Sequence, residues 1–364
     1  MTSIDSTFTN NNNNKSSKSS VELKHGDESV TIYLPKSIDP TKDAFYDSSR
    51  FEHGSMIGSF KTKDINGKVH TLYGPDLWAN PDDSRRSPVE MGSGLASEFG
   101  NGSGGSTSPE NFGWYPRKGV SNGVLGHDEV NSGEAFLKIG VGQLIKDGSS
   151  FKGPPLGTYK FAKDPIWTMM ETSSNSIVLE HEEMLRTHGY RLRKDISLTG
   201  KILSVTSTLT NLGKESFSTP WYCHNFYSCD GKKIGPGYEL DLELTPKTKE
   251  IYTVPSWAQD ITDFAEVTSS PPKLTIKLEK SLPDTTASVN FNEGKTTGTF
   301  TLNACGTSLK QEIPEVLDPN NNIEIYAFKI FVTDTTLSPE AFLLIKNLEP
   351  NQFAKWTQKV TFGN

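Results

Sequence analysis

Apolar and polar residues alternate with a period of two along much of this 364-residue chain. The alternation is clearest in four segments: VTIYLP (30–35), LSVTSTL (203–209), LDLEL (240–244) and LTIKL (274–278). Each segment places a row of apolar side chains on one face of a strand, and only Ser207 interrupts such a row. Clusters of Gly, Pro, Asn and Asp between the segments indicate turns, and no helical periodicity extends beyond ten residues. The chain is therefore predicted to be all-β, a sandwich of antiparallel strands.

Three stretches depart from this pattern. Residues 1–20 are polar, include five consecutive Asn, and predict a disordered low-complexity tail. Residues 80–133 are so rich in Gly, Ser and Pro that they predict a long loop region with one or two strands. Residues 306–324, of mixed polarity, predict a shorter linker. Because no clean linker divides the rest of the chain, we expect residues 21–364 to form one domain.

Composition and charge narrow the range of functions. Hydrophobic residues make up 34% of the chain, which fits strands that alternate apolar and polar side chains. The chain has 37 Lys and Arg against 44 Asp and Glu, a net charge of −7, and this excess of acid argues against nucleic-acid binding. No apolar run approaches the ~20 residues that cross a bilayer, so we expect no membrane partner. Three cysteines and the lack of a secretory signal predict free thiols in a reducing, cytoplasmic setting.

The strongest candidate for chemistry is His224, which lies in the aromatic segment TPWYCHNFYSCDG (219–231). Aromatic neighbours lower the local dielectric and can tune an imidazole for general acid or base catalysis. The alternative, a hydrogen-bonded histidine in the core of an aromatic-rich strand, fits the spacing equally well. Cys223 and Cys229 flank this histidine, but no second pair of ligands follows at zinc spacing. We therefore predict buried free cysteines rather than a zinc site in this segment.

Further candidates for a polar cleft are four charged residues in predicted strands or beside flexible segments: Arg50, Glu98, Lys138 and Glu340. Arg50 is expected to share a strand face with Glu52, where it either clamps a substrate or forms a surface ion pair with Glu52 or Asp47. Lys138 alternates with apolar neighbours, so it is either solvated or directed into a polar cleft. Glu340 begins an apolar run, where it is either a general base or a solvated residue at a strand edge.

The other histidines carry weaker signals. His181 and His188 lie among many charges and are expected on a solvated face. His127 lies in the predicted loop region, from which it can approach a cleft. His25 and His70 have no sequence neighbours that indicate chemistry. The chain contains no HExxH, GxSxG or phosphate-cradling GxxxxGK[ST] motif.

Several segments, taken together, resemble one branch of the aldose 1-epimerase (galactose mutarotase-like) superfamily. They are FYDSSRFEHGSMI (45–57), GLASEFG (94–100), LGHDEVNSGEAFLKIGVG (125–142), HGYRLRKDISLTG (188–200) with LTNLGKESFSTPWYCHNFYSCDG (209–231), and SPEAFLLIKNLEPNQFAKWTQKVTF (338–362). The segments follow the family's order, and the resemblance spans roughly residues 30–362. It implies a β-supersandwich, one large domain of antiparallel strands whose concave face holds a carbohydrate.

The resemblance also implies a mechanism. In this family a carboxylate takes the proton of the anomeric hydroxyl while a histidine protonates the ring oxygen, and the ring opens and then closes on its other face. His224 in YCHNF and Glu340 in SPEAF stand where the family has these groups, so we expect them to be the catalytic residues. The expected substrate-binding residues are Arg50, Glu98, Lys138, Tyr190, Lys194, Asn225 and Asp230. The family's second histidine and its sugar-orienting aspartate have no secure match here. Because the implied mechanism requires no metal and no organic cofactor, we expect none.

The expected function is therefore an aldose 1-epimerase-like isomerase acting on a monosaccharide, a sugar phosphate or a uronate. The alternative is a carbohydrate-binding protein, a lyase or another glycan-active enzyme on the same fold, without mutarotase activity. A structural protein is a third reading. Both site hypotheses require that His224, Glu340, Arg50 and Lys138 converge on one concave face, and scattered positions would remove both.

Overall fold

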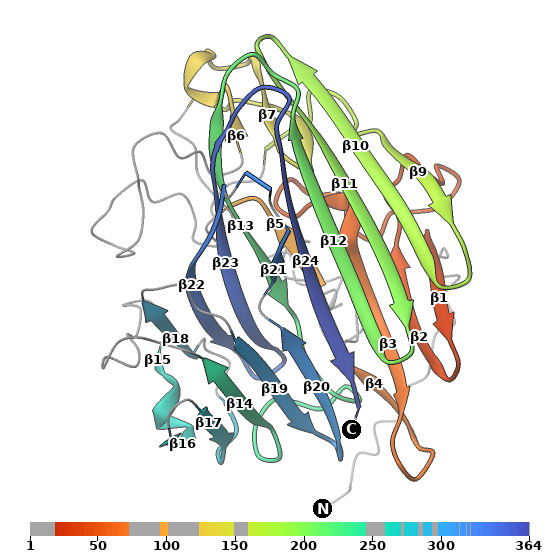
Figure 1. The fold of residues 1–364 in the computed structure, drawn as a ribbon, viewed down its shortest axis with the longest axis vertical. Coiled ribbons are helices and arrows are strands. Elements are labelled where there is room, and N and C mark those ends of the chain that lie inside the picture. Colours follow the sequence, from red (N-terminus) through yellow and green to blue (C-terminus); the bar gives the residue numbers. More distant parts are fainter. Residues whose placement is uncertain are drawn as a thin grey trace, which may run out of the picture.

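The protein is built from β-strands (Figure 1). The computed structural model describes residues 19–72, 95–100, 124–148, 159–244, 259–270, 273–282, 287–292, 298–312, 314–317, 319–320 and 322–363. Within these ranges the only helical elements are the 3-10 turns η1 (His53–Ser55), η4 (His127–Glu129) and η5 (Ile261–Asp263). This confirms the all-β prediction. Nearly all of the predicted tail, and most of the 80–133 region, lies outside the described residues.

Two large sheets are present in the described part of the chain. The first has the order β1 (Ser20–His25), β2 (Glu28–Tyr33), β3 (Met56–Lys63), β5 (Leu95–Glu98), β13 (Phe217–Asn225), β23 (Leu337–Leu348), β22 (Ile323–Val332), β18 (Ala287–Asn292) and β15 (Gln259–Asp260), with β4 (Val69–Leu72) also paired to β3. Its neighbours are antiparallel except for β15 and β18. This sheet carries most of the candidate chemistry.

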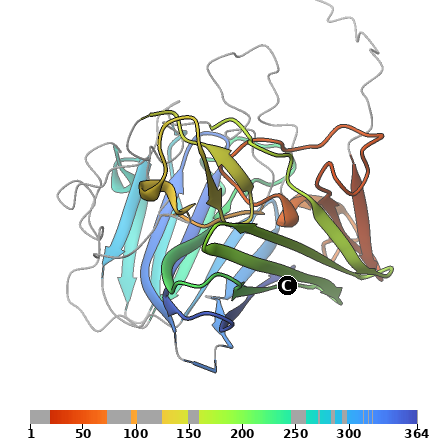
Figure 2. The same cartoon turned by 90° about the horizontal axis from the view of Figure 1, so that it is seen from above.

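The second sheet covers one face of the first (Figures 1 and 2). Its order is β16 (Ala265–Ser270), β17 (Lys273–Leu278), β14 (Glu239–Leu244), β19 (Gly298–Ala304), β20 (Thr307–Glu312), β24 (Phe353–Phe362), β12 (Ile202–Asn211), β11 (His188–Thr199), β10 (Ser176–Leu185) and β9 (Trp167–Thr172), with β21 (Glu315–Val316) also paired to β24. A small third sheet of β6 (Val124–Leu125), β7 (Ala135–Lys138) and β8 (Gly142–Ile145) lies near the upper ends of β10 and β11 in Figure 1.

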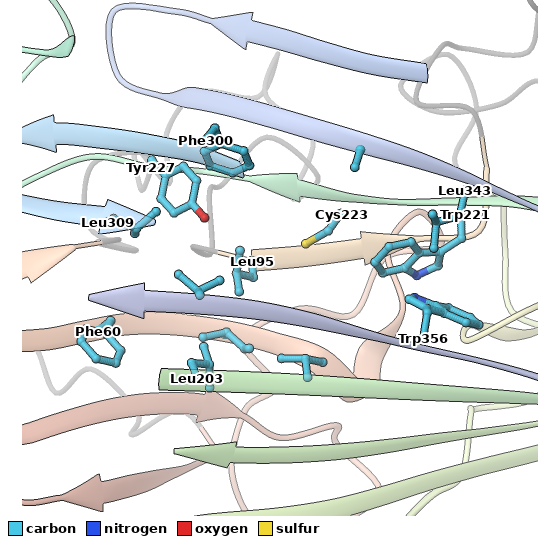
Figure 3. Packing of buried hydrophobic residues seen from close by; sticks show 14 of the residues in the cluster. Phe60, Leu95, Leu203, Trp221, Cys223, Tyr227, Phe300, Leu309, Leu343 and Trp356 are labelled. Carbon is cyan, nitrogen blue, oxygen red and sulfur yellow. The ribbon is translucent and has the colours of Figure 1, made fainter. Parts of the chain in front are cut away.

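The interior between the large sheets is filled by the alternating residues that the sequence pattern predicts (Figure 3). In β12, Leu203, Val205 and Leu209 are at most 4% exposed. The indole rings of Trp221 in β13 and Trp356 in β24 meet across the interior, with centroids 5.2 Å apart. Burying such rings removes large apolar areas from water, at ~25 cal/mol per Å². The sandwich is thus held by the residues that set its strand periodicity.

The linker predicted over residues 306–324 is wrong in its first half, because β20 and β21 occupy it. In β20, Leu309 and Gln311 are buried while Lys310 between them is exposed. Gln311 accepts a hydrogen bond from the Tyr227 hydroxyl, which satisfies its side chain inside the sandwich. The strand was missed because a buried glutamine reads as a solvated residue in the sequence.

Candidate functional site

Strand β13 presents alternate side chains to the two faces of its sheet. Trp221 and Cys223 belong to the core between the large sheets. Tyr222 and His224 therefore point to the other face, which is turned away from the second sheet. On that face β23 adds Glu340, in the strand next to β13.

His224 and Glu340 lie in contact, joined by Ser338. The His224 Nε2 atom is 3.5 Å from Glu340 Oε1. The Ser338 hydroxyl donates to Glu340 Oε1 at 2.8 Å and lies 3.1 Å from His224 Nδ1. His224 is 7% exposed, Glu340 4% and Ser338 0%. The face thus brings together an imidazole and a carboxylate in a setting that excludes most water.

The hydrogen bonds of Ser338 assign the tautomer of His224. A serine hydroxyl donates one hydrogen bond and accepts two. Ser338 Oγ accepts the backbone N–H of Asn225 at 2.8 Å and donates to Glu340, so one lone pair is left for His224 Nδ1. All three contacts are satisfied when Nδ1 carries the ring proton, an assignment from the bonding pattern. The Nε2 atom then has its lone pair directed at Glu340.

Burial shifts the charge states of this group toward neutrality. Desolvation, assisted by the charges of Arg50 and Lys329, holds the pKa of His224 well below its usual value. Desolvation raises the pKa of Glu340 to about 7, although Lys329 and Ser338 oppose the shift. Burial likewise lowers the pKa of Lys329 to about 7, against the attraction of Glu340, which lies directly opposite it in the β22–β23 ladder. At neutral pH His224 is therefore uncharged, and Glu340 can both hold and release a proton.

A second group of polar side chains adjoins this pair and centres on Glu98. Arg50 Nε donates to Glu98 Oε2 at 3.0 Å, and its Nη2 donates to the Tyr222 hydroxyl at 2.9 Å. Tyr222 donates in turn to Glu98 Oε2 at 2.8 Å, and Lys138 Nζ donates to Glu98 Oε1 at 3.3 Å. Each of these side chains is at most 10% exposed. The carboxylate of Glu98 is thus fixed by three donors from three separate segments.

Aromatic rings enclose the imidazole of His224. Phe226 stacks on it, with centroids 4.0 Å apart and planes 10° from parallel. The rings of Phe331 and Phe51 meet it edge-on, at 5.2 and 6.3 Å. These rings supply the low dielectric that depresses its pKa. The ring is thus buried like a core histidine, one of the two alternatives left open by the sequence, and it also contacts a carboxylate.

Five of the predicted site residues converge in this region, namely His224, Glu340, Arg50, Glu98 and Lys138. Lys138 reaches Glu98 from β7 of the third sheet, so these residues come together without sharing one sheet face, and their role in a concave site stays a prediction. Asn225 faces the second sheet, where its Oδ1 accepts from Gln358 at 3.3 Å. Tyr190 and Lys194 are fully buried elsewhere, and Asp230 lies beside His70. Substrate binding by these last four residues stays a prediction that their positions do not favour.

Two expectations about charged residues are wrong. Arg50 and Glu52 do not share a strand face, because residues 45–52 form no strand before η1 begins. Glu52 instead enters the interior, where it pairs with Lys194 Nζ at 2.5 Å. His181 is not solvated: it is 0% exposed and stacks on Trp167, with centroids 5.0 Å apart. Its charged neighbours in the sequence misled because alternate residues of β10 face opposite ways.

Ser338 and Lys329 were missed from the sequence. Ser338 stands two residues before Glu340, so the period of a strand already places both on one face, and this signal was available. Lys329 required the register of the β22–β23 hairpin, which pairs it with Glu340. A lysine inside an apolar strand carries no mark of its partner. Only the fold shows that the two residues are opposite each other.

Two groups of described side chains have the spacing of metal ligands: His70, Cys229 and Asp230, and the more exposed Glu129, His188 and Glu215. Neither group includes the acid–base pair. All three cysteines are free, as predicted, with Cys223 and Cys229 buried. Among the described residues no helix has the length and apolar character needed to span a membrane.

No family model matches the sequence, and no curated protein matches it. The structure is similar to a galactose mutarotase-like protein from Lactobacillus casei ATCC 334, with 12% identity, coverage of 94% of this chain and 99% of that chain, and a TM-score of 0.50. It also matches a galactose mutarotase related enzyme from Lactobacillus acidophilus (9% identity, 95% and 97% coverage, TM-score 0.48) and an aldose epimerase homologue from C. elegans (10%, 96% and 99%, 0.48). At this identity the likeness to the L. casei protein concerns the fold alone. The chain has a galactose mutarotase-like fold, which confirms the resemblance in its sequence at that level.

Proposed function

We propose that this chain, with its galactose mutarotase-like fold, is a sugar isomerase of the aldose 1-epimerase type that uses His224 and Glu340 as its acid–base pair. The observation that carries the proposal is the contact between His224 Nε2 and Glu340 Oε1, 3.5 Å apart, in a buried and aromatic setting. Perturbed titratable pairs cluster at functional sites, which makes this buried contact the candidate centre of the chemistry. The fold alone does not carry an activity.

The interconversion of sugar anomers requires two proton transfers, at two oxygen atoms that share one carbon. The anomeric hydroxyl oxygen O1 and the ring oxygen O5 are both bonded to C1, so the base and the acid must lie close together. His224 Nε2, with its lone pair free, takes the proton of O1, and the protonated Glu340 carboxyl gives a proton to O5. The C1–O5 bond breaks as the C1=O1 bond forms. After rotation about C1–C2, the imidazolium returns its proton to O1 and the carboxylate removes the proton from O5.

The family resemblance implies the reverse assignment, with Glu340 as base and His224 as acid. Both assignments place a single proton on the pair and differ only in which group holds it. The hydrogen bonds of Ser338 and the lowered pKa of His224 favour a neutral imidazole beside a protonated carboxyl. Because the two states have the same net charge, they share one pH dependence.

The Arg50–Glu98–Tyr222 group supports the second part of the proposal, that the ligand is a carbohydrate. Its hydroxyl, guanidinium and carboxylate stand ready to exchange hydrogen bonds with sugar hydroxyls, and the faces of aromatic rings suit the apolar face of a pyranose. The pair itself is less than 10% exposed, so a bound sugar would be largely shielded from water where its protons are transferred. A cytoplasmic location is part of the proposal and is supported by the three free thiols.

The test measures the approach to anomeric equilibrium by polarimetry, with free hexoses, hexose phosphates and hexuronates as substrates. We expect catalysis of at least one class, and losses of about 10²–10⁴-fold in Glu340→Gln and His224→Gln. Glu315→Gln is the matched control, since Glu315 pairs with Lys359 on the surface. Activity should fall as the pH rises through about 7, where Glu340 loses its proton, and persist below 6.5 because His224 stays neutral. Unchanged rates in both variants would sink the proposal, and saturable sugar binding without turnover would favour the carbohydrate-binding alternative.

A further inference from the structure

His70 is the centre of a second polar cluster, outside the acid–base site. Its ring is 0% exposed and lies between two carboxylates. Its Nδ1 is 2.9 Å from Asp230 Oδ2, and its Nε2 is 3.4 Å from Asp64 Oδ2. No local pattern singles out this histidine, because Asp230 lies 160 positions away in the chain.

A buried thiol completes the cluster. Ligand atoms of His70, Cys229 and Asp230 all lie within 4.8 Å of one another. Atoms bound to one Zn²⁺ at about 2.0–2.3 Å are necessarily within ~4.6 Å of each other, so the observed spacing needs only small side-chain adjustments. Nitrogen, sulfur and carboxylate oxygen are together the donor set of zinc and its neighbours, rather than of Mg²⁺ or Ca²⁺.

We propose that His70 Nδ1, the Cys229 thiolate and the Asp230 carboxylate form a site for a divalent transition metal of the zinc type, with Asp64 orienting the histidine. A metal-bound histidine commonly donates its other ring N–H to a carboxylate, which fixes the tautomer that binds metal. Asp64 stands on that side of His70. It is itself held by backbone N–H groups of Asn66 and Lys68, at 2.9 and 2.8 Å.

The backbone holds these ligands in place before any metal binds. Asp230 adopts a left-handed conformation (φ 52°) followed by Gly231 (φ 67°), in a tight turn that leads away from β13. Two hydrogen bonds hold that turn against β4. The Asp230 N–H donates to the Thr71 carbonyl at 2.8 Å, and the Thr71 N–H donates to Asp230 Oδ1 at 3.0 Å. A bound ion would therefore tie the β3–β4 hairpin to the chain that leaves β13.

Access and charge also fit an ion. The Asp230 side chain is 22% exposed, whereas His70 and Cys229 are buried, so a metal enters from the side of the carboxylate. Binding displaces the thiol proton of Cys229 into solvent. The exposed Lys68 Nζ lies 3.8 Å from Asp230 Oδ2 and competes with a cation for that carboxylate. Cys305 is the nearest described thiol, and it donates to the Cys229 carbonyl at 3.6 Å.

The test is a titration of the full chain with Co²⁺ under reducing conditions, followed by absorption. Cobalt is a spectroscopic substitute for zinc, and a thiolate ligand gives a sulfur-to-metal charge-transfer band. We expect this band in the wild type, its displacement by Zn²⁺, and its loss in Cys229→Ser. A metal at Glu129, His188 and Glu215 gives no such band, since that group contains no sulfur. Cys305→Ser is the matched control and should keep the band.

Three further variants report on the roles assigned. Asp230→Asn retains an oxygen for Thr71 and should weaken Co²⁺ binding, and Asp64→Asn should weaken it about 10–100-fold. Lys68→Met removes the competing cation and should tighten binding. Comparing the thermal unfolding of the metal-free variants with that of the metal-free wild type shows that each still folds. The absence of the band in the wild type, its persistence in Cys229→Ser, or its loss only in Cys305→Ser would each overturn the proposal.

Discussion

The ion pair of Glu52 and Lys194 offers a direct test of how the interior supports the site. Both side chains are fully buried between the sheets, with Lys194 Nζ 2.5 Å from Glu52 Oε2. Glu52 also accepts the indole N–H of Trp221 at 2.9 Å, and Lys194 donates to Ser207 Oγ at 2.8 Å. Glu52 lies two residues after Arg50, so the pair anchors the segment that delivers Arg50 to Glu98.

Removing one partner leaves an uncompensated charge in the interior. We expect Glu52→Gln and Lys194→Met each to lower the free energy of unfolding by ~3–5 kcal/mol. The double variant has no charge at positions 52 and 194, and the glutamine at position 52 keeps an amide oxygen for the Trp221 N–H. Its main cost is the unsatisfied Ser207 hydroxyl, ~1–3 kcal/mol, offset by the desolvation that is no longer required. The double variant should therefore be more stable than either single variant.

Urea unfolding at pH 7, followed by tryptophan fluorescence, measures these changes as shifts in midpoint at constant slope. The exposed pair Lys63–Asp27, at 2.7 Å, is the matched control, and Lys63→Met should cost at most ~1 kcal/mol. The reasoning is refuted if either single variant loses less than about 1 kcal/mol, or if the losses of the two single variants add in the double variant.

Three other outcomes follow from the site and its supports. Ser338→Ala should lower kcat with little change in KM and a native circular dichroism spectrum, because it removes the hydroxyl that orients both Glu340 and His224. An unchanged kcat argues against this positioning role. Glu98→Gln should cost ~3–5 kcal/mol in urea unfolding, since Arg50 keeps its buried charge without a carboxylate, and a loss below 1 kcal/mol contradicts this. Gly54→Ala should lower the unfolding free energy by ~1–3 kcal/mol, because an added Cβ would lie 2.1 Å from the Trp167 ring. A variant as stable as the wild type would contradict this close packing.

The strand pattern of the fold was predictable because it is local. The period-two rows of β2, β12, β14 and β17 need no partner to be recognised, and each forms the expected strand. The exception within one row is informative. Ser207 interrupts the apolar face of β12 because it lies opposite Lys194 in the β11–β12 ladder and accepts its hydrogen bond. The sequence contained both residues, but pairing them required the register.

The candidate site was predictable only in part, for the same reason. His224 and Glu340 were identified by an aromatic surround and by family resemblance, and their contact joins positions 116 apart in the chain. The network of Arg50, Glu98 and Lys138 joins three segments through sheet pairings and loop positions that no local pattern specifies. His70 was not recognised as a candidate from the sequence. Nothing near it in the chain marks it out, and its partner Asp230 comes from a distant turn.

Two of the buried charge groups, Glu52 with Lys194 and His224 with Glu340, differ in their contact distances, and this difference assigns support to the first and the proposed chemistry to the second. Around Glu52 and Lys194 an ion pair at 2.5 Å is flanked by two hydrogen bonds, from Lys194 to Ser207 at 2.8 Å and from Trp221 to Glu52 at 2.9 Å. Between His224 Nε2 and Glu340 Oε1 the distance is 3.5 Å, longer than a normal hydrogen bond, and the pKa of Glu340 is raised to about 7. The first arrangement resists any change of proton or partner. The second leaves a proton free to move to a substrate oxygen placed between or beside the two groups, as acid–base catalysis at a sugar ring requires.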